Sequence, residues 1–269
     1  MKIGYKSDVG MKRELDEDSI VIVRSDTVYE SKRTRSALLV LADGMGGHNA
    51  GEVASCLAAQ RVAEEMIRAM LKTPQRKLSD EVIAALFGES INQANREIMM
   101  YAEKNPQYKD MGTTVTAALI QGAQVYIGHV GDSRAYIIND REVRQLTKDH
   151  SLVQEMVDSG KITGEEAKNH PQKNIVTRTV GMHNQVDVDI TTEPVQVQDF
   201  LLLCCDGLTD MLSDEEIHAV VTENDDPQSI CDVLVEKANE KGGLDNISVI
   251  VVKFDEQEIK SATDDTRIR

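Results

Sequence analysis

Residues 37–48, Ala-Leu-Leu-Val-Leu-Ala-Asp-Gly-Met-Gly-Gly-His, decide how this chain folds. An unbroken apolar run that ends in Asp-Gly and further glycines predicts a strand buried on both faces, with the carboxylate of Asp43 at its end. A second apolar run, residues 200–205, ends in the same way at Asp206 and Gly207. Two carboxylates at the ends of buried strands predict one shared site.

The composition is that of one acidic globular domain. The chain has 269 residues, 41% of them hydrophobic, so it can bury a sizeable core, and no linker-like stretch divides it. Its 46 acidic and 30 basic residues leave a formal charge of −16. Such a charge repels phosphate backbones and anionic lipid surfaces, so we expect no nucleic acid and no membrane as partner. Excess carboxylates also suit a protein that gathers divalent cations, although a plain acidic surface has the same composition.

Cysteine usage and the N-terminus favour a cytoplasmic protein. Residues 1–8 contain no apolar segment of the kind found in signal peptides, and no stretch approaches the roughly eighteen apolar residues of a membrane span. The four cysteines have no framework spacing, and Cys204 and Cys205 are neighbours in an apolar run. We therefore expect buried, reduced thiols rather than disulfides or a zinc site.

The first half of the chain predicts strands followed by two helices. We expect an edge strand near residues 3–6 and a strand at 19–23, then a polar turn or hairpin loop at 24–36. Residues 50–71 repeat apolar side chains every three or four positions, which predicts a core-facing helix. Pro74 ends this helix, and Ser79 caps a second one that runs to about Tyr101.

The second half predicts further strands, a polar excursion and two more helices. An antiparallel meander is expected from four runs, with Asp132 at one of its turns: 113–120, 124–130, 133–138 and 142–145. Residues 147–180 are polar with two short helical pieces, which favours a lid over a functional face or a plain surface excursion. The remaining expectations are strands at 186–190, 200–205 and 244–252, helices at 214–221 and 228–239, and a polar tail at 255–269.

Acidic residues stand at the ends of several of these strands. Hard cations such as Mg²⁺ and Mn²⁺ prefer carboxylate, carbonyl and water oxygens, so a cluster of such acids suits two ions. A single Asp-Gly pair is more often a simple turn. The repetition of apolar strand and Asp-Gly is what favours a metal site here. The acids concerned are Glu17, Asp18, Asp43, Asp132, Asp206 and Asp245.

Seven motifs follow one another along the chain: Asp8-x-Gly10-x-x-Arg13-x-x-Asp16-Glu17-Asp18, Asp43-Gly-Met-Gly-Gly-His48, Gly112-Thr-Thr114, Gly131-Asp-Ser-Arg134, Thr147-x-Asp-His-Ser151, Asp206-Gly-Leu-x-Asp210 and Asp245-Asn-x-Ser248. In this order they resemble the metal-dependent protein phosphatase 2C family, and the Gly-Met-Gly-Gly-His form resembles its bacterial branch. The resemblance covers about residues 4–253, which is nearly the whole chain.

The resemblance implies an α+β fold, with two packed antiparallel sheets flanked by helices in an α-β-β-α sandwich. It also implies a metal-dependent protein serine/threonine phosphatase. Members hydrolyse phosphoserine and phosphothreonine by attack of a water that bridges two Mn²⁺ or Mg²⁺ ions, without a phosphoenzyme intermediate. The partners would be phosphoproteins, a Ser/Thr kinase or the substrates of such a kinase, and we expect a monomer. The phosphatase domain would span residues 1–254, with a flap at about 151–176.

Roles for single residues follow from the same resemblance. Asp43 would bridge the two ions with help from the Gly44 carbonyl, and Arg13 would bind the substrate phosphate through its planar fork of donors. Glu17 would support the centre from outside the direct ligands. Bacterial members can hold a third, weaker ion, and Asp132, Asp206 and Asp210 fit that position. The full set of expected metal ligands is Asp18, Asp43, Gly44, Asp132, Asp206, Asp210 and Asp245.

Two positions depart from the family pattern. Asp16 stands where members commonly have Asn, and its carboxylate either adds charge near the phosphate site or turns the loop. Eukaryotic members carry a His directly after Asp-Gly, whereas this chain has Met45 there and His48 later. His48 is a candidate general acid, with a structural role at the start of a helix as the alternative. A metal-held water is a third source of the proton.

Other classes of function stay open at this point. A regulatory pseudo-phosphatase would bind phosphoproteins through the flap without turnover, although the retained acids and Arg13 argue against it. A nucleotide-binding module is suggested by a glycine loop between a strand and a helix, but the glycine spacing matches no usual nucleotide pattern. A calcium sensor is disfavoured because the chain has no acidic loop of the roughly twelve-residue kind.

Overall fold

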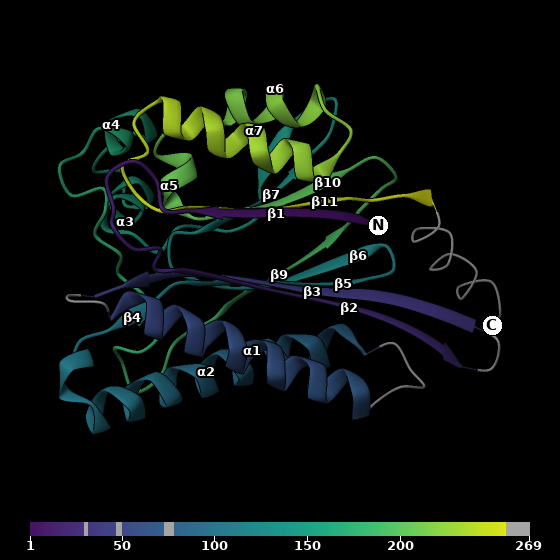
Figure 1. Ribbon diagram of the computed structural model, residues 1–269, viewed down its shortest axis with the longest axis horizontal. Coiled ribbons are helices and arrows are strands. Elements are labelled where there is room, and N and C mark those ends of the chain that lie inside the picture. The colour runs from purple at the N-terminus through teal and green to yellow at the C-terminus, as the bar shows by residue number, and fades with distance from the viewer. Residues whose placement is uncertain (30–31, 47–49, 73–77, 257–269) are drawn as a thin grey trace.

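Two antiparallel sheets pack face to face between layers of helices (Figure 1). The computed structural model describes residues 1–29, 32–46, 50–72 and 78–256. The first sheet has the order β1-β11-β10-β7-β8, formed by β1 (Lys2–Asp8), β11 (Ile247–Lys253), β10 (Phe200–Cys204), β7 (Arg134–Ile138) and β8 (Val143–Gln145). The second has the order β2-β3-β5-β6-β9, formed by β2 (Asp18–Tyr29), β3 (Lys32–Met45), β5 (Val115–Gln121), β6 (Gln124–Val130) and β9 (Asp189–Pro194), with β4 (Gly112–Thr113) beside β3.

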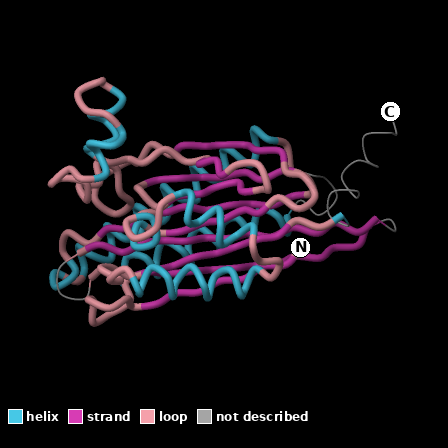
Figure 2. Tube along the Cα trace, turned by 90° about the horizontal axis from the view of Figure 1, so that it is seen from above, coloured by secondary structure: helices cyan, strands magenta, loops and turns pink. Residues whose placement is uncertain are grey.

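Helices cover the outer face of each sheet, which confirms the expected α-β-β-α sandwich. α1 (Gly51–Lys72) and α2 (Asp80–Lys104) lie on the second sheet, and α6 (Asp214–Thr222) and α7 (Pro227–Glu240) lie on the first. Figure 2 shows the long helices running alongside the strands. The short elements are η1 (Pro106–Tyr108), α3 (Leu152–Asp158), α4 (Gly164–Lys168) and α5 (Asp206–Thr209). No helix in these described stretches is both long and apolar enough to cross a membrane.

β3 is buried on both faces, as its apolar run predicts. Leu38 and Val40 pack toward α1 and α2, whereas Leu39 and Leu41 pack toward the first sheet. Each of these side chains is at most 1% exposed, and full burial of such a side chain contributes about 1.5–3 kcal/mol. β3 therefore belongs to two hydrophobic layers at once, which places Asp43 at the end of a strand that has little freedom to move.

The predicted loop at residues 24–36 is wrong wherever the structure describes it. β2 and β3 form one long hairpin, with a register that runs from Asp18 opposite Asp43 to Tyr29 opposite Lys32. Polar side chains do not prevent strand pairing, because the ladder uses backbone groups and this part of the hairpin needs no buried face. Asp26 and Arg35 lie opposite each other there, as a favourable cross-strand pair.

The predicted meander is also wrong, because the chain changes sheet after β6. β5 and β6 pair in the second sheet, whereas β7 and β8 pair in the first. The crossing segment contains Gly131, whose φ of +118° favours glycine, and then Asp132. The sheet change, rather than a hairpin turn, places Asp132 between the two sheets.

Several other predictions are confirmed with shifted ends. α1, α2, α3 and α4 lie where the periodicity and the caps place them, and Ser79 accepts a hydrogen bond from Val82 N at 3.4 Å. The strand expected at 186–190 begins instead at Asp189, where it pairs with β6, and Val186 packs with the helices. Most of the expected tail, from residue 257 onward, lies outside the described residues.

Candidate metal centre

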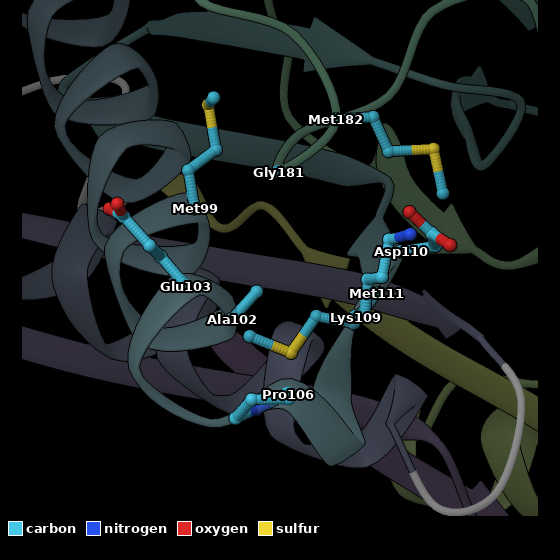
Figure 3. A pocket seen from close by; sticks show the side chains of 9 residues that line it. All are labelled: Met99, Ala102, Glu103, Pro106, Lys109, Asp110, Met111, Gly181 and Met182. Carbon is cyan, nitrogen blue, oxygen red and sulfur yellow. The ribbon is translucent and has the colours of Figure 1, made fainter.

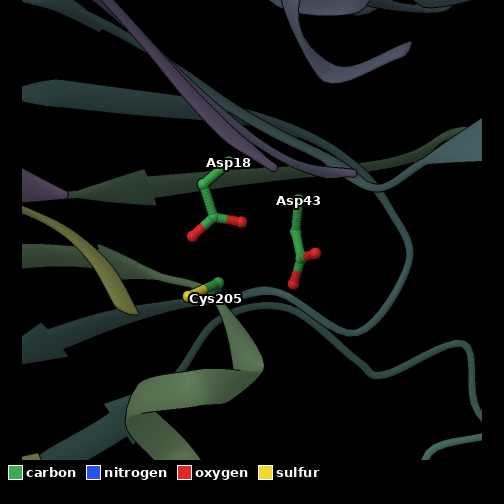
Figure 4. Close-up of side chains that lie close together, drawn as sticks. All are labelled: Asp18, Asp43 and Cys205. Carbon is green, nitrogen blue, oxygen red and sulfur yellow. The ribbon is translucent and has the colours of Figure 1, made fainter. Parts of the chain in front are cut away.

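Two carboxylates meet where the β2–β3 hairpin enters the body of the molecule. Asp18 begins β2 and lies directly opposite Asp43 in the register of the hairpin. Figure 4 shows both carboxyl groups directed into the same space, with Cys205 beside them. Ligand atoms of these three residues all lie within 4.8 Å of one another. The acid paired with Asp43 on the neighbouring strand is thus Asp18, whereas Asp206 belongs to the other sheet, where it follows β10.

The Asp18 carboxylate is buried without a partner. Within the described part of the chain, neither of its oxygens has a hydrogen-bond donor, and both are inaccessible to solvent. Its polar neighbours are engaged elsewhere, because Ser248 Oγ donates to Ser7 Oγ at 2.9 Å and Cys205 Sγ donates to the Asn246 carbonyl at 3.3 Å. Burial raises the pKa of Asp18 to about 7, and the nearby Ser248 hydroxyl and Cys205 thiol offset only part of this rise. An unsatisfied buried carboxylate is costly, and a cation is the partner that would satisfy it.

Neighbouring acids add further uncompensated negative charge beside Asp18. Burial, then the charges of Asp18 and Asp206, raise the pKa of Asp43 well above its usual range. Burial, then Asp132 and Asp210, do the same to the pKa of Asp206. Burial and the charge of Asp149 raise the pKa of Asp132 to about 6. These residues therefore form one mutually repelling carboxylate cluster, which we define as Asp18, Asp43, Asp132, Asp206, Asp210 and Asp245.

Cys205 belongs to this neighbourhood but not to the expected ligands. Burial raises the pKa of its thiol well above the usual value, so the sulfur keeps its proton. The sulfur also accepts a hydrogen bond from Ser248 N at 3.1 Å while donating to Asn246 O. Hard cations prefer oxygen to sulfur. Cys205 therefore orders the backbone beside the acids, where β10 ends and β11 begins.

Arg13 lies at the edge of the carboxylate cluster. Its Nη2 donates to Asp245 Oδ2 at 2.7 Å, and the two side chains are 48% and 36% exposed. The hydrogen bond to Asp245 raises the pKa of the guanidinium, so Arg13 stays charged. Only one of its N–H groups is engaged by a described residue, and the planar fork retains donors for a phosphate.

Asn246 anchors the loop that carries Arg13, and sequence reasoning missed this role. Its side-chain amide donates to Val9 O at 3.0 Å and Leu15 O at 2.8 Å, and its Oδ1 accepts from Glu17 N at 2.9 Å. A buried amide with three backbone partners locks a loop that has no regular structure of its own. The signal available in sequence was only that Asn246 follows Asp245.

Asp16 lies at the entrance of β2, where it has both a loop contact and an electrostatic effect. Its carboxylate accepts from Ser7 Oγ and from Asp18 N, so it turns the loop into β2. Its charge also contributes to the raised pKa of Asp18. Glu17 lies outside the cluster, against the start of α1, where a Cβ on Gly51 would come within 2.6 Å of its Oε1. Burial raises the pKa of Glu17.

The backbone at Asp43 is held from two sides. Asp43 N donates to Thr114 Oγ1 at 3.0 Å, and Asp43 O accepts from Thr114 N at 2.8 Å and from Thr113 Oγ1 at 2.8 Å. The next residue, Gly44, has no room for a side chain, because a Cβ would lie 2.2 Å from Gly51 O. The Gly-Thr-Thr motif thus fixes the end of β3 through hydrogen bonds. The glycine of the Asp-Gly motif lets the start of α1 pack closely against the same point. His48 lies outside the described residues.

A polar cleft of about 580 Å³ opens beside the cluster. Asp132, Asp206 and Asp210 line one part of it, and residues of the segment expected to form the flap (151–176), including Ser151 and Lys173, line another. A second pocket of about 710 Å³ lies between the end of α2, residues 109–111 and residues 181–182, and its lining includes Met99, Met111 and Met182 (Figure 3). Only the first of these pockets reaches the carboxylates, so it is the candidate path for a phosphorylated segment.

Comparison with known proteins agrees with this geometry. A family model described as protein phosphatase 2C matches residues 22–234. The chain is 39% identical to the serine/threonine phosphatase Stp of Listeria monocytogenes, over 95% of the chain and 96% of that protein. The Streptococcus agalactiae serine/threonine phosphatase superposes with a TM-score of 0.80 at 35% identity, covering 94% of this chain and 99% of that one. The catalytic domain of the serine/threonine phosphatase PstP, solved with two manganese ions, gives a TM-score of 0.76 at 34% identity, covering 93% and 96%.

Proposed function

The chain belongs to the protein phosphatase 2C family, and from this premise we propose that the carboxylate cluster is the metal centre of its activity. The protein is a metal-dependent serine/threonine phosphatase with phosphoproteins as substrates and Mn²⁺ or Mg²⁺ as cofactor. The observation that carries the assignment of residues is the buried Asp18 carboxylate, which faces Asp43 and has no donor among the described residues. An all-oxygen set of this kind fits a hard divalent cation.

The ligands follow from where each acid lies. Asp43 is central, since the charges of both Asp18 and Asp206 act on it, so we propose that Asp43 would bridge the two ions, with help from the Gly44 carbonyl. Asp132 and Asp210 act on Asp206 from the cleft side, which suits a third, outer ion. We assign the core ions to Asp18, Asp43, Gly44, Asp206 and Asp245 and the outer ion to Asp132, Asp206 and Asp210. Glu17 supports the centre from the start of α1.

The protein's own groups bind and orient the phosphate. Arg13 presents donors at the edge of the cluster, and the loop that carries it is fixed by Asn246. When bound, two such cations lower the pKa of a water toward neutrality and offset the charge on the phosphoryl oxygens. The hydrogen-bonded backbone of Asp43 would hold this carboxylate in place for the ions, and an activated water would make a side-chain nucleophile and a phosphoenzyme unnecessary.

The wider assignments are proposals of the same kind. We propose one phosphatase domain over residues 1–254, with residues 151–176 as its flap. We also propose a monomer that acts in the cytoplasm on the targets of a Ser/Thr kinase. The four cysteines are free thiols, which suits a reducing compartment.

Hydrolysis of a phosphothreonine peptide tests the assignment of the cluster. We expect turnover with Mn²⁺, loss of turnover with a chelator, and recovery when Mn²⁺ is added back. Asp206→Asn removes a ligand charge and should lower kcat/KM by more than the roughly 10–100-fold typical of groups that only support a ligand. The control is Asp232→Asn, which changes an acid that is 51% exposed on α7 and paired with Lys6. Equal activity of the two variants would disprove the assignment.

A further inference from the structure

The flap contacts the carboxylate cluster through one basic side chain. Lys173 Nζ lies 2.7 Å from Asp210 Oδ2, and the two side chains are 34% and 32% exposed. Across the described chain, no other hydrogen bond or ion pair joins residues 159–174 to a residue outside the flap. The remaining polar contacts of this segment are internal, such as the capping box of Thr163 and Glu166 on α4. Among the described residues, Lys173 therefore makes the one hydrogen-bonded ion pair between residues 159–174, which we call the flap tip, and the rest of the protein.

Asp210 is electrostatically part of the cluster even though it lies at its rim. Its charge acts on both Asp206 and Asp132, and all three line the same cleft as Lys173. Its backbone N–H donates to Asp206 O at 2.7 Å, which fixes it one turn of α5 away from that residue. A positive charge held on Asp210 therefore lowers the repulsion among the acids on this side of the cluster.

We propose that Lys173 is a stand-in cation that latches the flap onto Asp210 until a divalent ion takes the outer position. Both cations require the same carboxylate, so binding of the ion displaces the ammonium group and releases the flap tip. By linkage, a flap held closed through Lys173 weakens binding of the outer ion by the same factor. This inference rests on the proposed metal centre and adds a coupling between ion occupancy and flap position.

The strength of the contact suits a reversible latch. An ion pair that is one-third exposed changes an equilibrium by a factor of about two to five, because solvent screens it and both side chains lose freedom. A lysine is a single flexible point charge, unlike the planar arginine fork, so it can be displaced without distorting Asp210. A divalent ion carries twice the charge and competes effectively for the same oxygens.

Binding of Mn²⁺ alone, without any substrate, tests the latch. We compare the wild type with Lys173→Gln, and we use Lys168→Gln as the matched control. Lys168 is another flap lysine that lines the same cleft, but it pairs with Glu165 inside α4 and acts on Glu215 rather than on the cluster, so it controls for the loss of a positive charge in the cleft. The free Mn²⁺ signal in electron paramagnetic resonance gives the affinity of each class of site. We expect Lys173→Gln to bind the weakest ion about two- to fivefold more tightly and Lys168→Gln to match the wild type.

Proteolysis by a glutamate-specific protease reports the position of the flap, since Glu165 and Glu166 lie in α4. In the wild type and in Lys168→Gln, cleavage should accelerate as the weakest ion binds. Lys173→Gln should be cleaved at the faster rate without Mn²⁺ and should not respond to it. Unchanged affinity in Lys173→Gln, an equal Mn²⁺ response in all three proteins, or a titration without a third class of ion would overturn the latch. Neither measurement uses hydrolysis, so a protein that passes both but does not cleave phosphopeptides would refute the proposed function and keep the latch.

Discussion

Two basic residues determine where the negative charge of the carboxylate cluster is compensated. Arg13 and Lys173 each pair with one of its acids at 2.7 Å, on Asp245 and Asp210 respectively. Neither base reaches Asp18, whose oxygens have no donor among the described residues. The two basic side chains therefore neutralise the rim and leave the centre uncompensated. This distribution favours cations in the middle and a phosphate at the edge, where Arg13 lies.

Substitution of Arg13 tests its role at that edge. Arg13→Ala should lower kcat/KM toward a phosphopeptide by roughly 10–100-fold, because charge-assisted hydrogen bonds to phosphate contribute about 1.5–3 kcal/mol. Arg13→Lys should recover only a small part, since an ammonium group cannot donate two parallel hydrogen bonds. Steady-state kinetics at saturating Mn²⁺ give the ratio. Lys12→Ala is the control, and a loss of the same size there would show that only the loop charge matters.

Elements without regular structure position the chemistry, and each is fixed by a few specific contacts. The loop at residues 9–17 is held by Asn246, which precedes β11. The turn from β10 into α5 is possible because Gly207 has no side chain, since a Cβ there would lie 1.9 Å from Asn246 O. The end of β3 is fixed by Thr113 and Thr114. The strands supply rigid ends, and these contacts orient the loops and turns attached to those ends.

Removal of the Asn246 amide should loosen the Arg13 loop. Asn246→Ala breaks three hydrogen bonds to backbone groups and should lower the free energy of unfolding by about 1–3 kcal/mol for the groups left unsatisfied. It should also raise KM, because Arg13 loses its fixed position. Urea denaturation and steady-state kinetics measure the two effects. In the matched control, Asn224→Ala, an amide that donates to Val220 O in α6 is lost. That variant should keep its KM, and a parallel rise in KM would argue against a local effect.

At the scale of the whole molecule, the packing of two sheets assembles the site. Asp18 and Asp43 come from the second sheet, whereas Asp206 and Asp245 adjoin strands of the first. The two sheets are held together by a shared apolar layer that includes Leu39. One buried polar group in this sandwich is His129, which is 1% exposed. Its Nδ1 lies 2.9 Å from Thr116 Oγ1, and its Nε2 lies 3.2 Å from Lys148 O.

His129 makes the stability of the whole fold depend on pH. Burial, then the neighbouring His150, lower its pKa to about 4. Between about pH 4 and the usual value near 6.5 the unfolded chain binds the extra proton. The effect of His129 on the free energy of unfolding is therefore constant above pH 6.5. As the pH falls from 6.5 toward 4, this free energy decreases by about 3 kcal/mol because the unfolded chain takes up the proton.

Urea denaturation in the presence of a chelator checks this prediction at several pH values. Wild-type protein should lose about 3 kcal/mol more than His129→Gln between pH 6.5 and 4. Asp18 and Asp132 have raised pKa values and change stability in the opposite direction, but they are present in both proteins and cancel in the comparison. An identical pH dependence of the two proteins would show that His129 is not the group responsible.

The sequence correctly predicted the helices and strands that depend on residues only a few positions apart. The buried strand ending at Asp43 follows from its apolar run, and the caps at Ser79 and Ser213 follow from their side chains and the helices behind them. Residue order alone also identified the family, and it supplied the acids that we propose for the centre. The polar hairpin at residues 24–36 was missed because strand pairing is a backbone interaction, which side-chain polarity does not report.

Contacts between residues far apart in the chain account for the rest of the site. The strands that end in Asp-Gly, the long helices and the types of residue in the site could be read from the sequence, since each depends on neighbours a few positions away. The register of the long hairpin placed Asp18 against Asp43, the change of sheet after β6 placed Asp132 between the two sheets, and the fold of the chain after β8 brought Lys173 onto Asp210. Distances between sheets are set by the packing of whole layers, and no local pattern encodes them.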